Sequence, residues 1–289
     1  MIWLLLSILC STFIFVVFKL FDRYSVNNLQ AIVVNYFVAF AVGIASGGLH
    51  FNPVEVISKP WFFSILILGF MFITLFQLMA AVSQKFGVSA VSVAVKMSLA
   101  IPVLAAFVLY QESISTLKIA GVICALAAVY MATYKPEKTK GHPWQMFMPV
   151  LLFLGSGLLD AFINYNQRLL VPAHEHAYFA SGIFLIAGLL GILFVSIRKL
   201  KTHVPIKGKN IIGGIFLGIP NYGSIYFLLR ALEVPTLESS VVFPINNVGI
   251  VLLSVIVGRS AFSERLSGLN KAGIAFAIIA IALITFHQY

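Results

Sequence analysis

Long apolar runs recur along this chain roughly every 25 to 30 residues, and each is close to the length of about 20 residues that a membrane-spanning helix needs. Backbone groups in lipid must be bonded within their own segment, so runs of this length predict helices. The sequence therefore predicts an all-α membrane protein with ten transmembrane helices, at residues 2–18, 29–47, 61–82, 88–110, 117–134, 144–166, 178–197, 211–231, 237–257 and 266–286.

The composition agrees with a chain that lies almost wholly within a bilayer. Hydrophobic residues make up 61% of the sequence and charged residues only 10%, and the mean hydropathy is +1.02. A soluble domain of 289 residues could not bury this much apolar surface. The longest polar stretch, 198–210, is too short to fold alone, so we expect no extramembrane domain with soluble chemistry.

The net charge and the cysteines limit the possible partners. A net charge of +10 would suit nucleic acid, but the basic residues lie in short loops between apolar runs, as cytoplasmic loops of membrane proteins do. We therefore expect a lipid bilayer and a small molecule as partners, no nucleic acid, and a monomer or homodimer. Cys10 and Cys124 lie within apolar runs, which favours packing over a disulfide or metal site, and we expect no cofactor.

The two halves of the chain resemble each other. Segments 81–121 and 231–273 each contain an Ala, a Ser-bearing turn, an apolar helix with an internal Pro, then a Glu and a Gly, so that Glu112 and Gly121 match Glu264 and Gly273. Each half then holds five helices, in 1–134 and 144–289, joined by a loop at 135–143. Because five is odd, this predicts an inverted repeat, an architecture of secondary transporters with a midplane substrate site.

These matching segments resemble the EamA-type branch of the drug/metabolite transporter superfamily. The resemblance covers the whole chain and implies ten helices in two repeats and the transport of small solutes. That family ends its fourth helix in a Gly-Glu or similar pair, whereas this chain has Gln111-Glu112 and Ser263-Glu264, and Pro102 and Pro244 occupy different registers. The family varies its substrates widely, so the resemblance names none.

Basic residues divide unevenly between the two faces of the predicted bundle. The face of the odd-numbered loops carries 14 of the 19 Lys and Arg residues, and the other face carries 4. The positive-inside rule then places the odd loops in the cytoplasm and both termini outside, in a bacterial inner membrane. The resemblance implies both termini inside; the charge bias favours the first orientation.

Lys96 is the sharpest candidate for a substrate-binding residue. It lies eight residues into the fourth run, about 12 Å deep at about 1.5 Å per residue, and ionisable groups at that depth are costly and often functional. The equivalent region of the second half has Asn246 and Asn247 after Pro244, so an ammonium and two amides could together hold a carboxylate or phosphate. The alternative is that Lys96 pairs with Asp160 or with helix carbonyls.

Asp160 is the only acid well inside a predicted span, with Asn164 and Gln167 following it on the same helix face. A lone carboxyl at membrane depth suits proton coupling, so protons are a further predicted partner. The alternative is that Asp160 only balances the charge of Lys96.

Further polar residues in the spans are candidates for a cavity lining. Asn221 and Tyr222 follow Pro220, where the eighth span is expected to be interrupted, with a plain packing kink as the alternative. Gln77 lies in the third span and Ser11 in the first, although a serine hydroxyl can simply bond a carbonyl of its own helix.

Acids at the span ends have more than one interpretation. Glu112 and Glu264 could form a gate or contact a ligand, but the pattern favours boundary acids in the first turn of the next helix, where the helix dipole stabilises them. His174, Glu175 and His176 resemble a metal cluster, yet they lack further ligands and lie in a loop, so we predict no metal.

A membrane-embedded enzyme is the main alternative from another class. Prenyl transfer and intramembrane aspartyl proteolysis need paired or clustered acids, whereas the two Asp residues, Asp22 and Asp160, lie far apart. The chain has no His-Glu-x-x-His motif and no phosphate-cradling loop. We therefore predict that the protein is not an enzyme but a secondary-active transporter that exports or exchanges small, amino-acid-like metabolites through a midplane cavity between the repeats. The alternative is a membrane enzyme or scaffold without transport activity.

Overall fold

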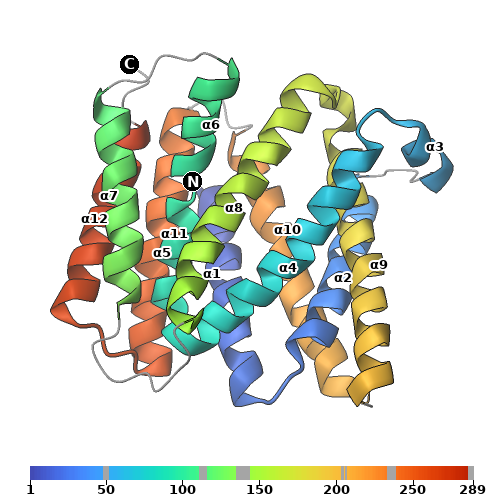
Figure 1. Cartoon of the computed structure of the whole chain (residues 1–289), viewed down its shortest axis with the longest axis horizontal. Coiled ribbons are helices and arrows are strands. Elements are labelled where there is room, and N and C mark those ends of the chain that lie inside the picture. The colour runs from blue at the N-terminus through green and yellow to red at the C-terminus, as the bar shows by residue number, and fades with distance from the viewer. Residues whose placement is uncertain are drawn as a thin grey trace. The chain divides into compact units, whose positions relative to one another are not determined.

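The computed structural model describes residues 1–47, 52–110, 116–134, 144–202, 205, 207–232 and 239–285 of the chain. These residues form helices and no β-strand, as expected where each apolar run must satisfy its own backbone groups. The helices, shown in Figure 1, are α1 (Ile2–Arg23), α2 (Asn28–Gly47), α3 (Pro53–Ser58), α4 (Phe62–Phe86), α5 (Val88–Met97), α6 (Ala100–Tyr110), α7 (Thr116–Thr133), α8 (Trp144–Leu169), the 3₁₀ turn η1 (Ala173–Glu175), α9 (His176–Thr202), α10 (Gly208–Leu232), α11 (Ser239–Phe262) and α12 (Gly268–Thr285).

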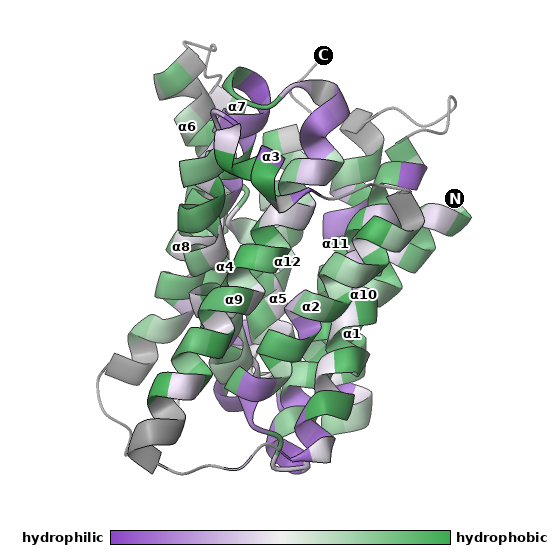
Figure 2. Cartoon of the chain, turned by 90° about the vertical axis from the view of Figure 1, so that its right-hand side faces the viewer, coloured by the Kyte–Doolittle hydropathy of each residue, from purple (hydrophilic) through white to green (hydrophobic). Residues whose placement is uncertain are grey.

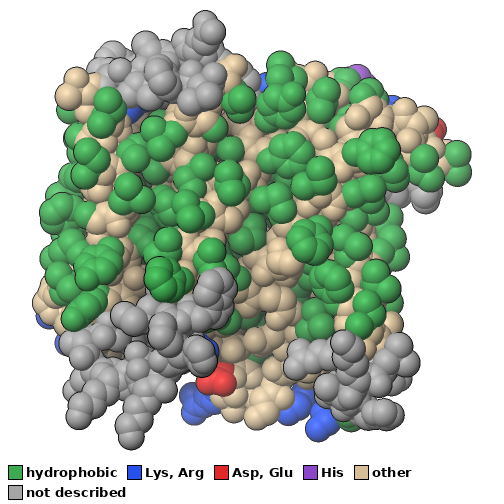
Figure 3. Space-filling model, in the orientation of Figure 1, with side chains coloured by type: hydrophobic (Ala, Val, Ile, Leu, Met, Phe, Trp, Pro, Cys, Tyr) green, Lys and Arg blue, Asp and Glu red, His purple; other side chains and the backbone are tan. Residues whose placement is uncertain are grey.

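A helix lies in each of the ten apolar runs of the sequence. Among the described residues, 9 spans are long and apolar enough to cross a membrane, and α12 adds a shorter apolar stretch, Gly268–Ile284. Figure 2 shows hydrophobic residues along the middles of the helices and hydrophilic residues at their ends, and the face drawn in Figure 3 is covered mostly by hydrophobic side chains. The chain is therefore an all-α integral membrane protein.

The helices form two compact units, and each unit draws on both halves of the sequence. Unit 1 consists of Met1–Lys19, Leu78–Ala161 and Gly223–Tyr289, and unit 2 of Leu20–Gln77 and Phe162–Tyr222. Four helices, α1, α4, α8 and α10, contribute residues to both units.

In unit 1, α7 and α12 pack closely along each other (Figure 1). A Cβ atom on Gly273 would overlap the backbone of Met131 and Ala132, and a Cβ atom on Gly121 would overlap Ile284. Small residues at such crossings let helix backbones approach closely, which is how membrane helices gain packing energy in lipid. Glycine is therefore required at both positions.

In unit 2, α2 and α9 form a comparable pair, in which Gly191 admits the side chain of Val33. Beside this contact the fully buried Tyr36 donates its hydroxyl to the carbonyl of Phe72 at 2.7 Å. The ring of Tyr36 lies with its centroid 5.3 Å from that of Phe76. A buried tyrosine hydroxyl needs a partner, and a helix carbonyl of α4 supplies it.

The fourth apolar run is not one helix but two, α5 and α6, separated by a turn at Ser98 and Leu99. Pro102 causes the break, because it has no amide hydrogen and its ring conflicts with the carbonyl four residues earlier, that of Ser98. That carbonyl instead accepts a hydrogen bond from the amide of Ile101 at 2.9 Å, and the Ser98 hydroxyl donates to the carbonyl of Val95 at 2.7 Å.

The other intramembrane prolines do not break their helices. The interruption predicted at Pro220 is wrong, since α10 continues through this residue, and α8 and α11 likewise continue through Pro149 and Pro244. A membrane helix tolerates proline where neighbouring groups satisfy the freed carbonyl. The asymmetry leaves a discontinuous helix in the first half of the chain only, as far as the described residues extend.

Candidate functional site

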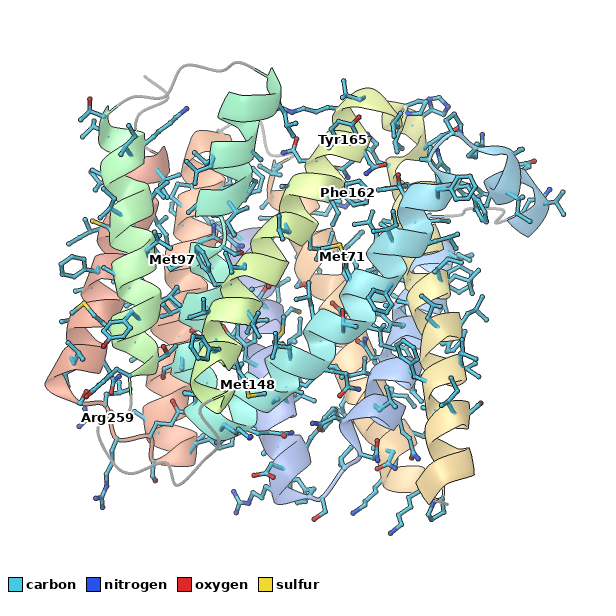
Figure 4. The ribbon with its side chains drawn as sticks, in the orientation of Figure 1. Met71, Met97, Met148, Phe162, Tyr165 and Arg259 are labelled. Carbon is cyan, nitrogen blue, oxygen red and sulfur yellow. The ribbon has the colours of Figure 1, made fainter. Side chains whose placement is uncertain are left out.

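Lys96 occupies the last turn of α5, next to the helix break. Its side chain is half-buried and makes no hydrogen bond or ion pair with another described residue. Met97, labelled in Figure 4, is buried and ends the helix. Non-helical backbone at membrane depth is tolerated where it lies within protein or lines a cavity, and Lys96 lies next to such a turn.

Asp160 belongs to the same unit, on α8. A Cβ atom on Gly157 would overlap Ile101, so α8 lies directly against the start of α6, and Asp160 follows one turn later. The charges of Lys96 and Asp160 act on each other, yet the two side chains form no ion pair within 4.0 Å. The structure thus brings the two charges to one region without joining them.

The helix α11 packs against α5 in unit 1, and the two run in opposite directions. Glu264, just beyond the end of α11, accepts hydrogen bonds from the amides that begin α5, so the end of one helix meets the start of the other. At this meeting point Gly258 of α11 lies against the hydroxyl of Ser89 in α5.

The antiparallel packing of α5 and α11 sets the heights of Lys96 and Asn247 along the two helices. Lys96 lies two turns beyond Ser89 on the same face of α5, and Asn247 lies three turns before Gly258 on the same face of α11. Their offset along the helix axis is then about one helical turn, near 5.4 Å. The adjacent Asn246 is buried, and its Oδ1 accepts no hydrogen bond from the described residues, an arrangement that buried polar atoms rarely adopt without a ligand or water.

Ser11 also lies in unit 1, buried in α1. The packing of α1 on α11 is tight, because a Cβ atom on Gly249 would overlap Ile8, one turn before Ser11. Of the eight predicted site residues, unit 1 therefore contains Lys96, Asp160, Asn246, Asn247 and Ser11.

The remaining three predicted residues belong to unit 2. Asn221 is buried and donates its side-chain amide to Oδ1 of Asn35 at 3.1 Å, and Tyr222 packs against Gly43. The amide nitrogen of Gln77 is buried without a hydrogen-bond partner among the described residues. Asn35 is fully buried and was not predicted; a single asparagine within an apolar run was the only signal for it.

The interpretation of Glu264 as an acid in the first turn of the next helix is wrong, because α12 begins only at Gly268. Its Oε1 accepts from the amide of Val88 at 2.6 Å, and its Oε2 accepts from the amide and the hydroxyl of Ser89 at 3.3 and 2.8 Å. The carboxylate therefore stabilises the start of a helix far away in the sequence. Its counterpart Glu112 lies outside the described residues.

A pocket of about 570 Å³ opens beside Glu264 in unit 1, a size typical of small-molecule sites. Lys19, Glu264 and Arg265 are its charged lining residues. The ammonium of Lys19 donates to the carbonyl of Gln84 at 2.7 Å. Arg259, labelled in Figure 4, is exposed in the last turn of α11 and adds to the basic character of this end of the unit.

Glu175 makes a polar cluster at the start of α9 in unit 2. It accepts from the ammonium of Lys59 at 2.7 Å and from the indole nitrogen of the fully buried Trp61 at 2.9 Å. These hydrogen bonds, first that of Lys59 and then that of Trp61, lower the pKa of the Glu175 carboxyl. His174 is 3.9 Å from Glu175 and exposed, while Nε2 of His176 is buried without a partner among the described residues.

Asn270 is a further polar residue that sequence reasoning missed. Its amide nitrogen donates to the carbonyls of Met131, Ala132 and Tyr134 at 3.0, 3.1 and 2.8 Å, and so caps the end of α7 from α12. The capping pattern between Ser267 and Asn270 was a local signal of a helix start, but it gave no indication of the second helix that Asn270 binds.

Comparison with other proteins relates the chain to a protein of a bacterium. No family model matches the sequence. A protein of Haemophilus influenzae that is described as uncharacterized is 30% identical over 289 residues, which covers 96% of this chain and 95% of that protein. The chain belongs to the same family as this protein. A protein of known crystal structure is similar with a TM-score of 0.59 over 97% of this chain and 96% of that one, at 17% identity, and so shares the fold.

Proposed function

We propose that this chain, as a member of the family of the Haemophilus influenzae protein, is a secondary-active transporter of a bacterial inner membrane. It resembles EamA-type drug/metabolite transporters, with ten spans in two inverted repeats. Its substrates are small, amino-acid-like metabolites that it exports or exchanges. Lys96 is the central residue of the substrate site.

The observation that carries the proposal is the break between α5 and α6 beside Lys96. Irregular backbone at membrane depth is tolerated where it is buried in protein or lines a cavity, and transporters use such breaks at their substrate sites. By contrast, the repeat-related helix α11 continues through Pro244. A lysine next to such a break adds a compact positive charge at this position.

Polar exposure along α8 supports the same proposal. Asp160 and, one turn later, Asn164 are both exposed on a helix that is long and apolar enough to span a membrane. Exposure of a carboxyl and an amide to lipid would be costly, so these side chains suit contact with water instead. A hydrated acid close to a substrate ammonium or to Lys96 is suited to carrying a coupling proton.

The charges favour a substrate with a carboxylate. Lys96 has no partner within the described residues, and Asn247 lies across from it in the register of α5 and α11. An ammonium and an amide both donate hydrogen bonds, and a carboxylate accepts from both. Asp160 carries the opposite charge and is suited to an amino group on the same molecule.

Thermal unfolding in detergent tests this function when it is screened over amino acids, nucleosides, sugars and amphiphilic cations. We expect an amino acid to raise the unfolding temperature, and the same compound, radiolabelled, to exchange across the membrane of proteoliposomes. The Lys96→Met variant should stay folded but lose a charged hydrogen bond to this amino acid. We expect the Kd for the amino acid to rise about ten- to a hundredfold.

Lys207→Met is the matched control, since Lys207 is an exposed lysine outside the spans. It should bind and exchange like the parent. Equal binding by Lys96→Met and the parent would remove Lys96 from the site. A cationic substrate would contradict the carboxylate site, and the absence of exchange for every screened compound would contradict transport of these classes.

A further inference from the structure

We infer that Glu264 is a positioning residue for Lys96, acting through the short helix α5; this role rests on the proposed function of Lys96. Glu264 does not approach the helix break itself. It holds the opposite end of the helix that carries Lys96, from the segment between α11 and α12.

The short helix α5 needs an external anchor. It has only 10 residues, and the turn at Ser98 and Leu99 separates it from α6. Helices this short are marginal without tertiary contacts. Its N-cap residue is Gly87, which supplies no side-chain hydrogen bond to the first amides of the helix. The helix therefore lacks both a continuous neighbour at one end and its own cap at the other.

Glu264 provides the missing cap. Its two carboxylate oxygens bind the amides of Val88 and Ser89 and the Ser89 hydroxyl, which satisfies donors that a helix start leaves free. A negative charge at this position also interacts favourably with the helix dipole. These contacts make one carboxylate the polar attachment of α5 to the second half of the chain.

The surroundings of the carboxylate are shaped to receive it. A Cβ atom on Gly87 or on Gly258 would overlap the Glu264 side chain, so both positions need glycine. Gly87 also has a φ of 106°, a conformation that side chains disfavour. The amide of Glu264 donates to the carbonyl of Gly258 at 3.0 Å, and Ser263 has a φ of 52°. The position of the Glu264 side chain is thus set by the backbone at Gly87, before α5, and by the backbone at the end of α11.

The anchor and Lys96 lie on one face of a single rigid element. Ser89 and Lys96 are seven residues apart, which is about two turns and about 10 Å along the axis. A small rotation of α5 about a released N-terminus would move Lys96 relative to α11 and α8. The pocket beside Glu264 gives water access to the anchor, so the carboxylate can exchange its helix contacts for hydration.

The test measures the position of residue 96 directly and needs no substrate. Lys96→Cys in a background with Cys10→Ser and Cys124→Ser is alkylated with N-ethylmaleimide in detergent. We expect Glu264→Ala to raise the alkylation rate about fivefold, as loss of a helix cap would. Glu264→Gln keeps an acceptor and should have a smaller effect. Ser89→Ala removes one donor, and its effect should also be smaller and in the same direction.

Two controls separate positioning from general loosening. Glu55→Ala removes an exposed acid in unit 2 and should leave the rate within about twofold, as surface substitutions do. A second reporter, Ile279→Cys, is exposed on α12 and should react at the same rate whether or not Glu264→Ala is also present. An unchanged rate for the reporter on α5, or an equal increase for the reporter on α12, would overturn the proposal.

The result is distinguishable from a failure of the proposed function. If Glu264→Ala does not fold, the Glu264→Gln and Ser89→Ala variants carry the test, and no shift in either of them contradicts the anchor. The alkylation rate reports only on α5, whereas binding and exchange by Lys96→Met report on transport. Either result can therefore fail while the other stands.

Discussion

At the residue scale, the Asp160 carboxyl can have two roles: it can balance the charge of Lys96, and it can carry a coupling proton. A direct ion pair would neutralise both groups and leave nothing for a ligand, but the two side chains form no pair within 4.0 Å. A residue that balances charge at a distance can still release a proton to a coupled reaction.

Asp160→Asn should abolish gradient-driven accumulation but leave exchange. The amide keeps the size and polarity of the side chain but cannot carry a proton, so only the coupled step is lost. Uptake of the amino acid found by thermal screening, measured in proteoliposomes with and without a pH gradient, checks this. Asp22→Asn is the control, because Asp22 is the other aspartate of the chain and is exposed at the end of α1. Full accumulation with unchanged pH dependence would make Asp160 structural.

The cluster of Glu175, Lys59 and Trp61 gives a prediction of pH dependence. The hydrogen bond of Lys59 lowers the pKa of the Glu175 carboxyl below its ordinary value of 4.5. The Glu175 carboxylate therefore contributes its full stabilisation above pH 4.5, and this stabilisation is lost as the pH falls through the pKa of the folded state. The hydrogen bond of Glu175 raises the pKa of the Lys59 ammonium above its ordinary value of 10.5. The Lys59 ammonium therefore contributes its full stabilisation below pH 10.5, and this stabilisation is lost as the pH rises through the pKa of the folded state.

Glu175→Gln should therefore unfold at a lower temperature than the parent by a constant margin between about pH 6 and about pH 9. The margin should shrink in acid, where the parent also loses its carboxylate. Thermal unfolding in detergent across this range measures it. Glu55→Gln, at an exposed acid close to Lys59, should show a much smaller margin. A margin that grows as the pH falls below 4.5 would contradict the assignment.

At the scale of elements, the pairing of α7 with α12 depends on backbone contact. The atoms nearest to a Cβ on Gly273 belong to the backbone of Met131 and Ala132, which cannot move aside as a flexible side chain can. By contrast, a Cβ on Gly268, at the start of the same helix, would meet nothing within 4 Å. Gly268 is therefore a control position for Gly273 within the same helix.

Gly273→Ala should lower the free energy of unfolding by about 1–3 kcal/mol through overpacking. Gly268→Ala should leave it unchanged or raise it by up to about 1 kcal/mol, because alanine restricts the unfolded chain. Denaturant unfolding in detergent, followed by circular dichroism, compares the two variants. Equal stabilities would show that α7 and α12 separate freely at Gly273.

At the scale of the whole molecule, the basic loops predict the orientation in the membrane. The stretch at 198–210 contains five of the 19 Lys and Arg residues, and the positive-inside rule places it in the cytoplasm. Lys207→Cys, in a background without Cys10 and Cys124, should resist a membrane-impermeant thiol reagent in intact cells and react after permeabilisation. Val54→Cys, exposed in α3 within an even-numbered loop, should react in intact cells. The reverse pattern would place both termini in the cytoplasm.

The sequence by itself determined the class of the protein and the location of its helices. Lipid requires each span to bond its own backbone, so length and hydropathy suffice to locate a helix without reference to any partner. All ten apolar runs contain helices for that reason. Lys96 and Asp160 were also identifiable as candidates from the sequence, because an ionisable group within an apolar run is conspicuous.

The tertiary structure decided which segments act together. Pro102, Pro149, Pro220 and Pro244 all lie inside predicted spans, but among them only Pro102 follows a helix break, since the outcome depends on what neighbouring helices offer the freed carbonyl. Glu264 caps α5, 176 residues away in the sequence, a contact with no local signature. The two units likewise combine segments from both halves of the chain, because packing between helices depends on side-chain shape, which hydropathy does not record.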